Sequence, residues 1–156
     1  MSDQFDFISA NDRPALLAFS TPEWLDSVRT CVQELGYKVH TAATHSDFLI
    51  RFSQVRYQLV VLEECFAANT MEENLTLRSL QNMPMSQRRH AAVILLGSSF
   101  QTFTPTQAFE KSVHAVINSS ELFLIKQLIE KSVGDNAMFL HSYREASNRV
   151  YSAGKN

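Results

Sequence analysis

Two neighbouring glutamates are the residues in this sequence whose position could support chemistry. Glu63 and Glu64 follow residues 59–62, four apolar side chains of which two are β-branched. A run without a polar face is typical of a strand buried on both sides of a parallel sheet. Open α/β folds bind ligands beyond the carboxyl ends of such strands. We therefore expect both carboxylates at the rim of a functional edge.

Small polar residues follow three further apolar runs. They are Ser20 after residues 15–19, Gly97 and Ser98 after residues 91–96, and Asn118 after residues 113–117. Each run has the length of a strand, so these residues are expected at the same edge as the glutamates. A fifth strand is predicted at residues 37–42, with Lys38 and His40 on an outer face typical of a sheet edge.

Apolar residues at steps of three and four predict helices between these strands. The predicted helices are residues 22–35 closed by Gly36, residues 44–55, residues 72–83, one from Pro105 with Phe109 on its inner side, and one from Glu121. Residues 83–90 are expected to be a polar connector. The alternation predicts an α/β fold of three layers, with a doubly wound, five-stranded parallel sheet covered by helices on both faces.

The last helix has two possible forms. One seam at steps of three and four, apolar except at Ser132 and Asn136, continues past the expected end at Val133. Its members are Leu122, Ile125, Ile129, Ser132, Asn136, Phe139, Tyr143, Ala146 and Val150. An unbroken helix over residues 121–150 would be about 45 Å long. The alternative is a break at Gly134 and a short helix folded back on the body. The predicted organisation is a tail at 1–13, a domain at 14–133 and a helical extension at 134–156.

Composition narrows the class of protein. The 156 residues are 45% hydrophobic with a net charge of −2, which predicts one domain and argues against direct nucleic-acid binding. No run is long enough to span a membrane and no signal peptide is recognisable, so a cytoplasmic location is expected. Cys31 and Cys65 are expected to be reduced thiols, and the five histidines lack metal-ligand spacing. We expect neither a metal nor a cofactor.

The order of these elements resembles a response-regulator receiver domain of the chemotaxis type. The resemblance rests on the apolar first strand, the acid after the third strand, the hydroxyls after the fourth and the short fifth strand before an amphipathic helix. It covers residues 14–133 and implies the strand order 2-1-3-4-5. Active members of that family have a magnesium-binding acidic pair after the first strand and a phosphoaccepting aspartate after the third. They have a hydroxyl residue after the fourth strand and a lysine after the fifth.

The family's chemical positions carry over poorly to this sequence. The acidic pair falls on Phe19 and Ser20, whereas magnesium needs a carboxylate. The phosphoacceptor position falls on Glu63, or on Glu64 with a shift of one residue, and the hydroxyl position falls on Gly97 or Ser98. The lysine position falls on Asn118. These departures indicate a degenerate receiver, or pseudo-receiver, without catalytic residues. Glu63 resembles a permanently charged mimic at the phosphoacceptor position.

Protein–protein interaction is therefore the expected function, in bacterial signal transduction. The resemblance implies an interaction surface on the helix from Pro105, the strand at 113–117 and the last helix. The candidate contact residues are Phe109, Lys111, Leu124, Lys126 and Gln127 on this surface, with Phe139 and Tyr143 on the outer half of the last helix. A homodimer through either surface is expected. The alternatives are an atypical phosphorylatable regulator and a small-ligand sensor with a pocket above Glu63.

Overall fold

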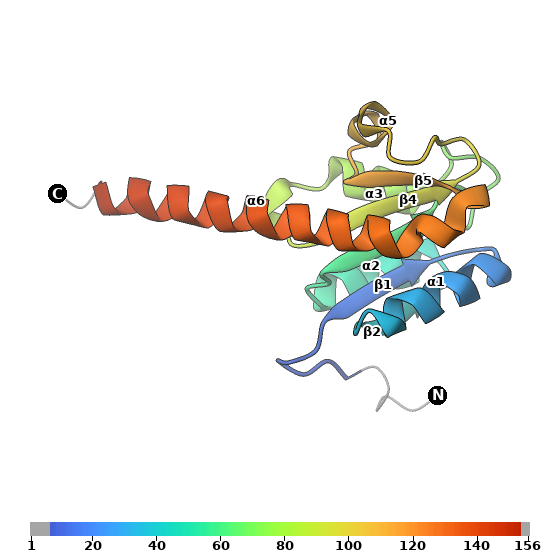
Figure 1. Ribbon diagram of the computed structural model, residues 1–156, viewed down its shortest axis with the longest axis horizontal. Helices are drawn as coiled ribbons and strands as arrows, with labels where there is room; N and C mark the ends of the chain where they lie inside the picture. The colour runs from blue at the N-terminus through green and yellow to red at the C-terminus, as the bar shows by residue number, and fades with distance from the viewer. Residues whose placement is uncertain (1–6, 154–156) are drawn as a thin grey trace.

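A five-stranded sheet forms the centre of the molecule (Figure 1). The computed structural model describes residues 7–153, with side chains up to residue 150. All strands are parallel and their order, β2-β1-β3-β4-β5, is the predicted one. The strands are β1 (Pro14–Ala18), β2 (Lys38–Ala42), β3 (Leu59–Glu63), β4 (Ala92–Gly97) and β5 (Ala115–Asn118). Every residue of β3 is buried, as its unbroken apolar run requires.

Helices cover both faces of the sheet and divide the core into two clusters. One face is covered by α1 (Pro22–Glu34) and α6 (Ile125–Ala153), and the other by α2 (His45–Gln54), α3 (Leu75–Asn82) and α5 (Pro105–Glu110). A 3₁₀ helix, η2 (Ser119–Leu124), precedes α6, and a four-residue helix, α4 (Met85–Arg88), precedes β4. This confirms the three-layer fold. None of the helices within residues 7–153 has an apolar stretch that could cross a bilayer.

Several local predictions were wrong. Phe109 is 84% exposed, and its neighbour Ala108 faces the core instead. The third helix begins at Leu75 rather than residue 72, because the Asn74 side chain caps it there by accepting a hydrogen bond from the Leu77 amide at 3.1 Å. The predicted connector at 83–90 contains α4. His40 is buried, with Nδ1 2.7 Å from the Tyr57 hydroxyl.

The last helix is continuous, so the alternative with a break at Gly134 is wrong. α6 runs for 29 residues and leaves the body of the molecule (Figure 1). Asn136 attaches the helix to the body beyond the glycine, because its Nδ2 donates to the Arg89 carbonyl at 3.2 Å. The Val93 amide donates to Nδ1 of His114, so Nε2 carries the proton and donates to Oδ1 of Asn136 at 3.2 Å. Residues 1–6 of the predicted tail and residues 154–156 of the predicted extension lie outside the described part of the chain.

Candidate functional site

Glu63 ends β3 and binds the loop that follows β1. The backbone amides of Ser20 and Thr21 donate to its Oε1 at 3.2 and 3.0 Å, and the side chain is 5% exposed. Both amides lie at the start of α1, where the helix dipole also favours a negative charge. The carboxylate is thus held by donors that another anion would otherwise use.

Glu64 binds the opposite neighbour, the loop after β4. The Ser99 amide donates to its Oε1 at 3.1 Å, and the Glu64 amide donates to the Leu96 carbonyl at 2.7 Å. Its side chain crosses Gly97, where an added Cβ would lie 2.6 Å from Cδ and 2.7 Å from Cβ of Glu64. Gly97 is therefore the residue that leaves room for this buried carboxylate. The two glutamates face opposite sides because successive side chains of an extended segment alternate.

Asn74 fixes the segment that carries both glutamates, and sequence analysis missed its role. Its Nδ2 donates to the Glu63 and Glu64 carbonyls at 3.1 and 3.0 Å, and the residue is 1% exposed. An asparagine before a helical stripe was the available signal, because asparagine is a favoured cap. The Ser20 hydroxyl fastens the same loop by accepting from the Ala67 amide at 2.7 Å.

Asn118, which the sequence comparison with receivers matched to a lysine, holds two loops together. Its Nδ2 donates to the Phe100 carbonyl at 2.7 Å, and its Oδ1 accepts from the Ser120 amide at 2.9 Å. Ser98 is exposed, and only its carbonyl lies near Asn118, at 3.4 Å from Nδ2. The structure thus brings Glu63 to Ser20 and Glu64 to Gly97, and it gives Asn118 a structural role.

The donor set at this edge does not fit magnesium. Phe19 offers no oxygen and is buried in the core beneath α1 and α6, Ser20 uses its hydroxyl on the Ala67 amide, and one oxygen of Glu63 already accepts two amides. Among the described residues, no three His, Cys, Asp or Glu side chains converge to hold a metal ion. The residues at this edge therefore do not reproduce the magnesium site of an active receiver.

Cys65 is a weak candidate for a nucleophile. Burial raises the pKa of its thiol, and the neighbouring carboxylates of Glu64 and Glu63 raise that pKa further. The thiol therefore stays protonated at neutral pH, whereas the thiolate is the reactive form.

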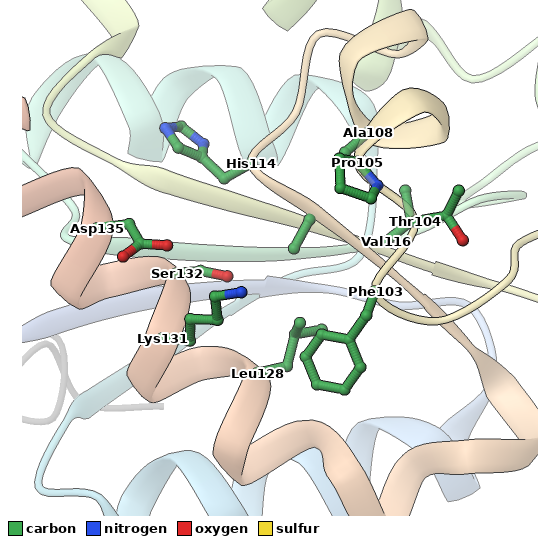
Figure 2. Close-up of a pocket in the computed structure, with 11 residues that line it drawn as sticks. Phe103, Thr104, Pro105, Ala108, His114, Val116, Leu128, Lys131, Ser132 and Asp135 are labelled. Atoms are coloured by element: carbon green, nitrogen blue, oxygen red, sulfur yellow. The ribbon is translucent and has the colours of Figure 1, made fainter.

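The predicted interaction surface contains a cavity of about 250 Å³ between α5, β5 and α6 (Figure 2). Phe103 and Leu128 lie on one side of it, and Lys131, Ser132 and Asp135 approach it from α6 (Figure 2). We call this surface the α5–β5–α6 face, defined by the residues lining the cavity together with Phe109, Lys111, Leu124, Lys126 and Gln127.

The candidate contact residues are not equally available. Phe109 and Gln127 are exposed, and Lys111 is half-buried. Leu124 packs against the core beneath α1 and α6, and Lys126 forms an ion pair with Glu34 at 2.9 Å. The exposed apolar area on this face includes Phe109, which is 84% exposed, and Phe103, which is 43% exposed.

The outer part of α6 carries aromatic side chains beyond Gly134. Phe139 is 55% exposed and Tyr143 is 43% exposed, and their rings stack with centroids 6.5 Å apart. The Arg89 guanidinium lies 4.3 Å from the centre of the Tyr143 ring, which ties this helix to the body. Phe139 is the more available of the two.

Comparison with solved structures identifies the fold. No family model matches the sequence, and no curated protein matches it. Chemotaxis response regulator CheY4 of Vibrio cholerae is similar with a TM-score of 0.58, at 15% identity over 78% of this chain and 99% of that chain. A CheY-like receiver domain protein from Methanospirillum hungatei JF-1 has a TM-score of 0.63, at 14% identity over 82% of this chain and 98% of that chain.

A third similar structure is also of a CheY-like protein. TadZ from Pseudomonas aeruginosa PAO1 has a TM-score of 0.56, at 14% identity over 78% of this chain and 99% of that chain. Likeness at this level of identity concerns the fold, and it agrees with the strand order and the packing of helices described above. The chain therefore has the CheY-like response-regulator receiver fold.

Proposed function

We propose that this chain is a degenerate receiver that acts as a protein–protein interaction module in bacterial two-component signalling. It relays information through contacts and is not phosphorylated by the usual aspartyl-phosphate mechanism. The observation that carries the proposal is the bonding of Glu63, because its Oε1 accepts the Ser20 and Thr21 amides. Receiver domains in general are signalling modules rather than enzymes, which agrees with this role.

Phosphoryl transfer would need groups that this edge does not supply. The transferred group carries negative charge that a metal ion or a nearby cation must neutralise. Here Phe19 and Ser20 stand at the metal positions, and Asn118 stands where a lysine would be. Oε1 of Glu63 would have to leave two amide hydrogen bonds before it could attack.

The proposed partners are signalling proteins, including a second copy of this chain. The α5–β5–α6 face offers exposed Phe109, and the outer part of α6 offers exposed Phe139. We propose that one of these surfaces forms a homodimer in the cytoplasm. Residues 14–133 would then serve as the receiver-like domain, and residues 134–156 as a helical extension.

Intact mass spectrometry tests the absence of phosphorylation. The protein is incubated with magnesium and acetyl phosphate beside a phosphorylatable receiver as the positive control. We expect the control to gain the mass of one phosphoryl group and this chain to keep its mass. A stable adduct that disappears in Glu63→Gln would refute the proposal and establish an atypical phosphorylatable regulator instead.

A further inference from the structure

A second cavity lies at the edge of the sheet opposite to Glu63. Its volume is about 370 Å³, within the range of roughly 300–1,000 Å³ typical of small-molecule sites. Arg56 and Gln58 line it from the segment before β3, and His90 lines it from the segment before β4. The remaining wall comes from α6, from residues on both sides of Gly134.

The charged side chains around this cavity are all basic. Arg56 and Arg144 line it, and no aspartate or glutamate among the described residues does. Within residues 7–150, neither guanidinium group forms a hydrogen bond or an ion pair with another side chain or with the backbone. Two guanidinium groups that approach one cavity from different elements are suited to bind a carboxylate or a phosphate.

His90 supplies a buried polar group that lacks a partner. Both ring nitrogens are inaccessible to solvent, and neither finds a hydrogen-bond partner among the described residues. The ring stacks on Phe52 with centroids 5.2 Å apart. Burial, with a smaller contribution from the charge of Arg56, lowers the pKa of His90 to about 4, so the imidazole is neutral at pH 7.

Three of the five residues that α6 contributes to the cavity wall are apolar. Val133, Ala137 and Leu140 line it at helical spacing, and Val133 also packs on the core beneath α1 and α6. The cavity therefore combines a basic side with an apolar side. A fully hydrated inorganic ion would use only the first of these two sides.

We propose that this cavity binds a small organic anion, with its charged group on Arg56 and Arg144 and its apolar body against α6. The His90 ring forms part of the cavity wall with its nitrogens covered, so it reports on a bound ligand without holding it. The site joins the body of the molecule to α6, since Arg56 and His90 belong to the body and Arg144 belongs to the helix. It is separate from the edge that carries Glu63, so it stands whether or not that edge is phosphorylated.

Phenyl phosphate is a suitable probe, with benzoate and inorganic phosphate as comparisons. The His90 imidazole resonance, assigned with the variant His90→Phe, is followed by NMR during each titration. We expect a saturable shift with phenyl phosphate and a rise of the His90 pKa above its value of about 4. Arg56→Gln and Arg144→Gln should each weaken binding about tenfold or more, because each removes a charge-assisted hydrogen bond.

Arg149→Gln is the matched control, because Arg149 lies on the same helix outside the cavity and pairs with Glu145. It should leave binding unchanged. Binding of benzoate in addition would support the proposal and show that one negative charge is enough. No saturable shift of His90 with either aromatic probe would overturn it. Equal affinity for inorganic phosphate and phenyl phosphate would overturn the role of the apolar wall.

Discussion

Replacement of Gly97 by alanine tests the buried position of the Glu64 side chain. An added Cβ would lie 2.6 Å from Cδ and 2.7 Å from Cβ of Glu64, and real Cβ atoms do not approach other heavy atoms so closely. The Glu64 side chain, together with the backbone that carries its Cβ, must therefore move away. Its carboxylate would then leave the Ser99 amide, which donates to it at 3.1 Å.

The expected loss of stability has two parts. A hydrogen bond to a charged group contributes about 1.5–3 kcal/mol, and overpacking of a filled site costs about 1–3 kcal/mol. Glu64 is 7% exposed in the folded protein, and a displaced carboxylate that reaches water regains part of this energy. We therefore expect Gly97→Ala to lower the free energy of unfolding by about 2–5 kcal/mol, measured by urea denaturation.

Gly134→Ala is the matched control for this substitution. Nothing lies within 4 Å of the position its Cβ would take, and Gly134 is inside α6. Alanine should therefore stabilise the protein by about 0.5–1 kcal/mol through helix propensity. Combining Gly97→Ala with Glu64→Ala should cost at least about 1 kcal/mol less than the sum of the single losses, because two residues in contact are coupled. Additive losses, or a Gly97→Ala variant as stable as the wild type, would refute the packing described here.

Three further outcomes follow from the contacts described above. Asn74→Ala should lower the free energy of unfolding by about 2–4 kcal/mol, because it removes a helix cap and two buried hydrogen bonds. Asn82→Ala, at an exposed position, should change that free energy little. Equal effects of the two variants in urea denaturation would contradict the role of Asn74. The folded pKa of His90, about 4, lies below its ordinary value of 6.5, so the unfolded chain binds the proton first and stability falls as pH drops from 6.5 towards 4. With allowance for partial exposure, the loss of stability is about 1 kcal/mol. His90→Phe should remove this loss, whereas His141→Gln, at an exposed side chain, should leave it in place. A pH profile of urea midpoints that is the same in His90→Phe as in the wild type would contradict this explanation. Phe139→Glu should convert the proposed homodimer to a monomer in light scattering if α6 forms the interface, and a wild-type monomer would exclude the homodimer altogether.

The arrangement of the sheet could be predicted from the sequence because each strand is short and most are apolar throughout. β3 and β4 have no polar face, and such strands occur between covering helices. Side-chain direction in short helices was harder to predict. α5 has six residues, too few for a stripe to show which side is buried, and Phe109 was predicted to face inward although Ala108 fills that position.

The continuity of α6 depended on contacts between residues distant in sequence. Gly134 disfavours a helix by about 1 kcal/mol, which leaves both predicted forms open. Asn136 resolves the choice through the Arg89 carbonyl and the His114 ring, which lie 47 and 22 residues away along the chain. Spacing within the helix itself could not reveal these partners.

Several residues of the candidate site could be predicted from the sequence, but most of their hydrogen bonds could not. The sequence placed Glu63 and Ser20 at one edge, but it could not show that main-chain amides hold the carboxylate. Backbone donors have no sequence signature, since every residue except proline carries one. Likewise, the sequence does not show that Glu63 binds the loop after β1 while Glu64 binds the loop after β4, because this depends on how the loops fold.

The unbroken α6 also gives the molecule a lever. The contact of Tyr143 with Arg89 lies 10 residues before Ala153, which corresponds to about 15 Å of helix. A tilt of about 10° at that contact would move the far end by about 3 Å, while the sheet itself stays in place. A small rearrangement around Arg89 would thus change the direction of α6 and move its far end.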